Sequence, residues 1–156
     1  MSLTSPLIKG GITCTEVITD DTLNTNARSV QHTLFDELTT PSPATVFSGA
    51  GYALVAGALS LDLRAIRTVA GGTGDGNGLK VQGFYFKNLG ANVMTITDGA
   101  SNGYLLLGTD GLVTVPPGGW IVMSLADASA DVDATHKTID IAGTLVQTFE
   151  FAVIMG

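Results

Sequence analysis

The chain has 156 residues, which is enough for one domain with a hydrophobic core and short for two. Hydrophobic residues make up 45% of it and charged residues only 13%, whereas soluble domains carry about 25% charged residues. The net charge is −7 and the seven Lys and Arg residues are scattered, which excludes the basic stripe that direct nucleic-acid binding requires. The shortage of charge indicates that contacts between subunits cover part of the surface.

The two long charge-free stretches do not predict a membrane span. Residues 38–61 contain two prolines, and their apolar part is about 11 residues, against the roughly 20 that a spanning helix needs. Residues 111–126 contain Pro-Pro-Gly-Gly at their centre. We therefore expect no contact with a membrane. Cys14 is the only cysteine, so no intrachain disulfide or multi-cysteine zinc site can form.

The first elements of the chain are an arm and then strands. Residues 1–12 are polar and irregular and are predicted as an extended N-terminal arm, followed by a single domain over residues 13–156. Cys14–Asp20 is typical of a strand, while Ser29–Leu38 fits a helix and a strand almost equally. Ala58–Ile66 alternates apolar and polar residues, which is the period of a half-buried strand.

The stretch Leu79–Asn88 changes phase in its middle. Leu79 and Val81 share one face, but Phe84 and Phe86 fall in the opposite phase. Gly83 lies at the change, so we predict a β-bulge there.

The rest of the chain contains short strands separated by tight turns. Five Asx-Gly pairs and 20 glycines in all favour hairpins. Residues 126–135 are predicted as a loop or one helical turn. This spacing predicts an all-β fold, an antiparallel β-sandwich or barrel. The predicted strands are Val93–Thr97, Tyr104–Leu107, Leu112–Val115, Trp120–Leu125, Lys137–Ile141 and Val146–Ile154.

Strand 120–125 has two apolar faces. Ile121 and Met123 lie on one face with Leu125, and Trp120 and Val122 lie on the other. Because only one face can cover the domain's own core, we place Trp120 and Val122 at a subunit interface.

One short motif resembles a hydrolase signature. Residues 99–103 match G-x-S-x-G, and Asp110 or Asp127 and then His136 follow in the order of a hydrolase triad. That motif requires a strand, a sharp turn and a helix, but the apolar run after residue 103 is typical of a strand. We interpret the motif as a hairpin turn and assign no catalytic residue.

The candidate metal and ligand sites match no specific motif either. Asp127, Asp131 and Asp133 could bind calcium, but their spacing is not that of an EF-hand, and we interpret them as a solvated acidic loop. His32 and His136 lack neighbouring ligands. The glycine-rich residues 70–78 are interpreted as a flexible surface loop. No metal and no cofactor is predicted.

Two segments carry a resemblance to a known group of proteins. The first runs from Phe84 to Ile96 and contains Asn88-Leu89-Gly90-Ala91-Asn92, and the second is Pro116-Pro117-Gly118-Gly119 leading into an apolar strand. Together they resemble small jelly-roll structural proteins of tailed-phage virions, of the head decoration or auxiliary capsid type. The resemblance covers about 45 residues and rests on turn chemistry.

The resemblance implies a role and partners. It implies a jelly-roll sandwich, a homotrimer or similar oligomer, an arm lying on a neighbour, and binding to the major capsid protein on the outside of a capsid. The protein would be made in the host cytoplasm and reside on the virion surface. Leu7 and Ile8 of the arm are assigned to the interface together with Trp120 and Val122.

Two other functions remain open from the sequence. A carbohydrate-binding or receptor-binding β-sandwich module would use exposed aromatic residues, for which Trp120, Tyr52 and Tyr104 are candidates. A hydrolase would depend on Ser101. The structural subunit is our main expectation, because few charges and many β-branched residues suit an extensive interface.

Overall fold

The computed structural model describes residues 7–18, 28–39, 45–68, 72–125 and 129–156, with the backbone alone for residues 7–18, 28–39 and 45–50. These residues form twelve strands and no helix. The strands are β1 Leu7–Ile18, β2 Arg28–Thr39, β3 Thr45–Ala53, β4 Ala58–Asp62, β5 Ile66–Arg67, β6 Thr73–Gly74, β7 Val81–Asn88, β8 Met94–Asp98, β9 Leu112–Val115, β10 Trp120–Ser124, β11 Thr138–Ala142 and β12 Thr148–Met155.

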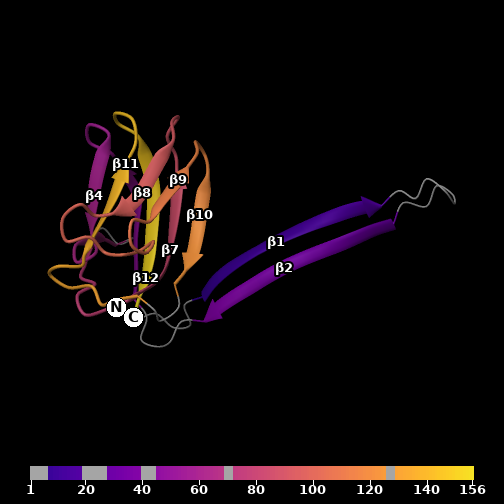
Figure 1. The fold of residues 1–156 in the computed structure, drawn as a ribbon, viewed down its shortest axis with the longest axis horizontal. Helices are drawn as coiled ribbons and strands as arrows, with labels where there is room; N and C mark the ends of the chain where they lie inside the picture. Colours follow the sequence, from indigo (N-terminus) through magenta and orange to yellow (C-terminus); the bar gives the residue numbers. More distant parts are fainter. Residues whose placement is uncertain (1–6, 19–27, 40–44, 69–71, 126–128) are drawn as a thin grey trace.

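Eight of these strands build a sandwich of two antiparallel sheets (Figure 1). One sheet has the order β10-β7-β12-β3 and the other β4-β11-β8-β9. Counted in chain order, the first of the eight lies beside the eighth, the second beside the seventh, the third beside the sixth and the fourth beside the fifth. This nested pairing is that of a jelly roll. The expected antiparallel sandwich is therefore confirmed, and its strand order is that of the jelly roll.

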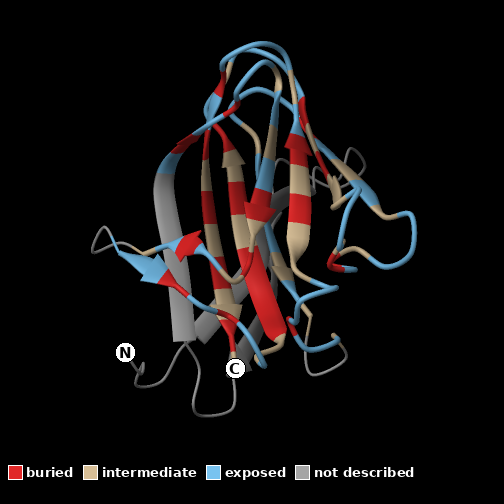
Figure 2. Ribbon diagram, turned by 90° about the vertical axis from the view of Figure 1, so that its left-hand side faces the viewer, coloured by how far each residue is buried: buried red, intermediate tan, exposed pale blue. Residues whose placement is uncertain are grey.

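The core lies between the two sheets and follows from alternation along the strands. In β12, and in β7 from Phe84 onward, every second residue is buried, so Phe86, Phe149 and Phe151 point inward. Figure 2 shows buried and partly exposed residues alternating along strands of the sandwich. Ile139 and Ile141 of β11 face them from the other sheet and are also fully buried. The ring of Phe149 stacks on both Tyr52 and Phe86, with centroids 5.4 and 5.1 Å apart.

The predicted bulge in β7 is confirmed. Ile154 of β12 pairs with Gly83, but the next residue, Met155, pairs with Val81. Gln82 is thus the extra residue, and the shift lets Val81 and Phe84 both point into the core. A phase change at a glycine was sufficient to find it.

The fold decides one expectation that the sequence left open and differs from two others. Residues 28–39 form a strand, which resolves the ambiguity between helix and strand. Residues 104–107 are not a strand, although β9 and β10 form where expected. Residues 72–78 of the glycine-rich segment are not a free surface loop, because Gly74 and Gly76 are buried and the Gly76 amide donates to the Leu63 carbonyl.

Residues 104–107 form a loop and not a strand. The side chains of Tyr104 and Leu106 extend from this loop into the core. The Tyr104 ring is buried, and its hydroxyl donates to the Ala130 carbonyl at 2.7 Å and accepts from the Val81 amide at 3.1 Å. Leu106 is also buried. A short apolar run between turns has the same composition whether it forms a strand or a loop whose side chains enter the core.

The N-terminal part of the chain forms a separate two-stranded ribbon. β1 pairs antiparallel with β2 from Leu7↔Thr39 to Ile18↔Arg28, and neither strand joins the two sandwich sheets. The ribbon extends away from the sandwich (Figure 1). Strand pairing therefore begins at Leu7, inside the segment predicted to be irregular. The division of the chain at residue 12 stays a prediction.

Candidate interaction surface

The two outer faces of the sandwich differ in polarity. On the β10-β7-β12 face, cross-strand pairing places Val122, Tyr85 and Ala152 in one row. The row on one side contains Trp120, Lys87 and Glu150, and the row on the other side ends in Ile154. The outer face of the other sheet carries more polar side chains, Ser60, Asp62, Thr95, Thr97, Thr114, Thr138 and Asp140, together with Leu112, Ala58 and Ala142.

Trp120 and Val122 therefore lie where the sequence predicted, on the outward face of β10. The Trp120 side chain is 65% exposed and Val122 is also exposed, whereas Ile121 and Met123 pack against the core. Burying a large aromatic side chain removes 150–250 Å² of surface from water. The face around Trp120 is thus the least polar sheet surface among the described residues and the candidate interaction surface of this chain.

The backbone of β10 adds an open edge to this surface. The Asn88 amide donates to the Gly119 carbonyl and the Leu125 amide to the Gln82 carbonyl, so the odd-numbered residues of β10 bond to β7. The amide and carbonyl groups of Trp120, Val122 and Ser124 consequently point away from β7. Since β10 is the last strand of its sheet and these groups pair with no other described strand, they form an open edge.

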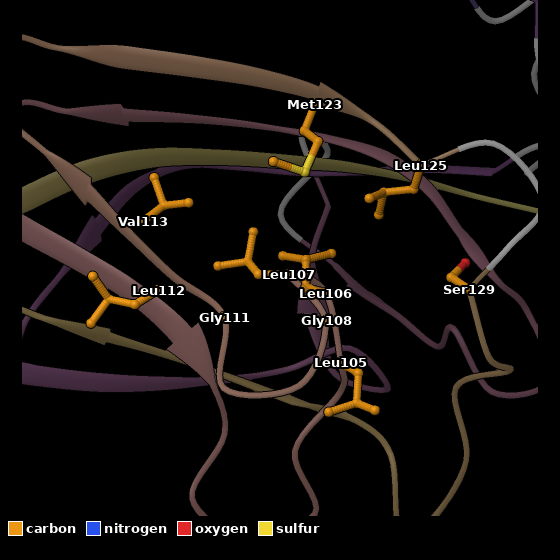
Figure 3. A pocket seen from close by; sticks show the side chains of 10 residues that line it. All are labelled: Leu105, Leu106, Leu107, Gly108, Gly111, Leu112, Val113, Met123, Leu125 and Ser129. Carbon is orange, nitrogen blue, oxygen red and sulfur yellow. The ribbon is translucent and has the colours of Figure 1, made fainter.

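A groove lies beside this edge, between β10 and β9, which are the end strands of the two sheets (Figure 3). It has a volume of about 450 Å³. Its walls are Met123 and Leu125 from β10 and the segment after it, Val113 from β9, and Leu105 and Leu107 from the loop between β8 and β9. Among the described residues, the lining includes no ionisable side chain. Sequence periodicity could find the β9 and β10 residues, but Leu105 lies in a loop that shows no period.

The loops at one end of the sandwich form a second apolar surface. The β3–β4 and β11–β12 loops expose Val55, Leu145 and Val146, the last two at 74%, and the β7–β8 loop exposes Leu89 and Val93. The described loops at the other end contain Asp75, Asp110, Asp131 and Asp133 together with Arg64, Lys80 and Lys137, and Asp98 ends β8 there. The charged loop residues among those described are therefore gathered at one end of the sandwich.

The side chain of Asn88 forms hydrogen bonds that stabilise the end of the sandwich with the apolar loops. These hydrogen bonds account for the Asn88–Asn92 motif. Its side chain is fully buried at the end of β7. The Nδ2 group donates to the Asn92 carbonyl at 2.8 Å and to the Val115 carbonyl at 3.0 Å, and Oδ1 accepts from the Gly90 amide at 2.8 Å. One side chain thus closes the β7–β8 turn and ties it to β9.

The residues of the hydrolase-like motif serve turn packing. A Cβ at Gly99 would collide with the Thr138 side chain, and one at Gly103 would collide with the Gly99 carbonyl oxygen. The Ser101 carbonyl accepts from the Thr138 hydroxyl at 2.5 Å. No helix follows within the described residues, so the motif is a turn as expected. The expected tight hairpin is wrong, because residues 104–107 form no strand and the next strand is β9.

The acidic and histidine residues form no ligand cluster in the part of the chain that the structure describes. Asp133 accepts from the Thr135 amide and hydroxyl and from the His136 amide, all within 2.9 Å. These contacts hold the pKa of the exposed Asp133 carboxyl far below its usual range. No described group of three His, Cys, Asp or Glu side chains could hold a metal ion. Asp127 and the side chains of His32 and Cys14 lie outside the description.

Two of the three aromatic residues considered for sugar stacking are unsuitable. Tyr52 and Tyr104 are buried, and Tyr52 packs against Phe149. Trp120 alone offers an open ring face. The side chains of Leu7 and Ile8, the other predicted interface residues, lie outside the described side chains, so their assignment stays a prediction.

Asp98 is a partly buried acidic residue at the end of β8. Both carboxylate oxygens are shielded from water and make no normal hydrogen bond with a described residue. Burial raises the pKa of Asp98, the nearby amides of Leu107 and Leu106 oppose this, and the charge of Asp110 adds to it. Since the folded pKa is the higher one, the folded state binds the proton more tightly than the unfolded state. Stability therefore falls as pH rises from the unfolded pKa through the folded pKa.

We expect Asp98→Asn to remove this loss. The variant should gain unfolding free energy at pH 7 and lose the decline between acidic and neutral pH. Urea denaturation at pH 4, 5, 6 and 7 measures it, with the exposed Asp131→Asn as the control. A decline of equal size in Asp98→Asn would show that another group causes it.

Comparison with known proteins gives no match to a family model, a curated protein or a solved structure. Among the described residues, no helix has the length and apolar character of a membrane span.

Proposed function

We propose that this chain is a non-enzymatic structural subunit of a tailed-phage virion, a capsid decoration protein that binds and stabilises the major capsid lattice as a homo-oligomer. The observation that carries the proposal is the β10-β7-β12 face, where Trp120, Val122, Tyr85, Ala152 and Ile154 stand on the outside of a jelly-roll sheet. Lys87 and Glu150 lie beside Trp120 on this face, and its other paired residues are uncharged. Such a face suits a contact between proteins, because aromatic residues are enriched and charges depleted at interface cores.

Two further features support a role in assembly. The chain carries only 13% charged residues, and its described acidic loops lie at one end while the other end is uncharged. This distribution of charge suits a subunit that binds a lattice through one end and binds its own copies through a side face. Residence on the virion and synthesis in the host cytoplasm belong to the same proposal.

The first test is the solution mass of the purified protein by light scattering, with and without EDTA. We expect a homo-oligomer whose mass does not change with EDTA, since the sequence resemblance implies a homotrimer or a similar oligomer. The protein is then added to undecorated capsids of the phage that encodes it, and sedimentation reports binding. A monomer that does not bind these capsids would contradict the proposal.

We predict that Trp120→Ser weakens self-association at least about 10-fold, because an aromatic anchor at the centre of an interface contributes about 2 kcal/mol. The mass is measured against protein concentration. The control is Leu145→Ser, which removes a side chain of comparable exposure from the loop end of the sandwich. Full assembly of Trp120→Ser would remove Trp120 from the interface.

A carbohydrate-binding module is the second candidate, and the exposed ring of Trp120 on a sheet face is the observation that favours it. It predicts a monomer that binds a sugar. Strong binding on a glycan array, lost in Trp120→Ser, would support the module in place of the structural subunit.

A further inference from the structure

The free edge of β10 has the composition of a strand that pairs with another strand. Natural sheets protect such edges with charged residues, proline or bulges. β10 has none of these, since its sequence is Trp-Ile-Val-Met-Ser and its pairing with β7 is regular. The groove beside it is apolar and open.

The edge is also complementary to itself. Trp120, Val122 and Ser124 each present one amide and one carbonyl outward. If a second β10 lies antiparallel with Val122 opposite Val122, then Trp120 lies opposite Ser124 on both sides. All three residues are then hydrogen-bonded pairs, with two bonds for each pair and six bonds in total. A shift of this register leaves some of the groups unpaired.

The distribution of charge favours the edge of β10 for a contact between identical chains. The chain has a net charge of −7, so most surfaces of two copies repel each other. No residue from Gly111 to Leu125 is ionisable, which covers β9, β10 and the turn between them. The described acidic residues of the loops lie outside this segment.

We propose that β10 pairs with β10 of a second copy about a twofold axis through Val122, which joins two four-stranded sheets into one continuous sheet. The inward-facing Ile121 and Met123 of the second copy then cover the mouth of the groove. This inference rests on the self-association in the proposed function and names the contact. A five-residue edge falls short of the roughly 800 Å² per partner of a standard interface, so the dimer is expected to depend on concentration.

The first variant is Val122→Pro, which removes only an amide that points away from β7. Proline is tolerated on an edge strand when its missing amide faces outward. We expect an unchanged far-UV spectrum and melting curve, and a dimer dissociation constant raised by about 100-fold or more. A folded Val122→Pro that still dimerises at the original concentration would overturn the twofold contact.

Cross-linking tests the register without relying on Val122→Pro. In a Cys14→Ser background, Val122→Cys is expected to form a disulfide-linked dimer under mild oxidation, because hydrogen-bonded pairs have Cα atoms about 5.5 Å apart. Ser124→Cys on the same edge is the matched control and should not cross-link to itself, since its partner position is Trp120. Equal cross-linking of both variants, or of neither, would overturn the register.

The solution mass separates this inference from the proposed function. A dimer supports both. A trimer that binds capsids would overturn the twofold contact and leave the proposed function standing. A monomer that binds capsids would overturn the contact and the homo-oligomer, and a monomer without capsid binding would overturn both proposals.

Discussion

Replacement of Asn88 by leucine is expected to lower the free energy of unfolding by about 3–5 kcal/mol. The buried Asn88 side chain satisfies the carbonyls of Asn92 and Val115 and the amide of Gly90. Leucine leaves these three groups without a partner, and each buried unsatisfied group costs about 1–3 kcal/mol, less where water can reach it. Urea denaturation followed by circular dichroism measures the loss.

The matched control for Asn88→Leu is Asn92→Ala. Asn92 lies in the same turn, but its exposed side chain makes no hydrogen bond with a described residue, and only its backbone takes part. We expect a change within about 0.5 kcal/mol. If the two variants lose stability equally, the Asn88 side chain does not organise this end of the sandwich.

Phe149→Ala is expected to have an effect of similar size, about 3–5 kcal/mol, through a cavity. Phe149 is fully buried near the start of β12, and its ring stacks between Tyr52 and Phe86. The loss comprises the transfer of the ring from the core to water and the space that its neighbours cannot fill. Thermal and urea unfolding measure it.

The control for Phe149→Ala is Val146→Ala, three residues earlier in the chain and exposed to solvent. It should change the unfolding free energy by less than about 0.5 kcal/mol. A loss below about 1 kcal/mol for Phe149→Ala would mean that the aromatic stack is not the centre of the core.

Local pattern was sufficient for several features of this protein. The alternation in β10 and β12, the bulge beside Gly83 and the loop character of the G-x-S-x-G motif could be predicted, because each depends on neighbours in sequence. A strand must turn every second side chain to the core, and a phase change at a glycine leaves few alternatives to a bulge. The same reasoning placed Trp120 and Val122 on the outward face before the sheet was known.

Tertiary structure decided the rest. Tyr104–Leu107 is as apolar as a strand, and only the contacts of the Tyr104 hydroxyl with Val81 and Ala130 show that it is a core plug. Whether β10 is an edge or a central strand is a property of strand order, which no local pattern contains. The groove beside Met123 and the burial of Asp98 arise from segments far apart in the chain. The sequence by itself determined which residues face in and which face out, and the pairing of the strands decided which outward residues share a surface.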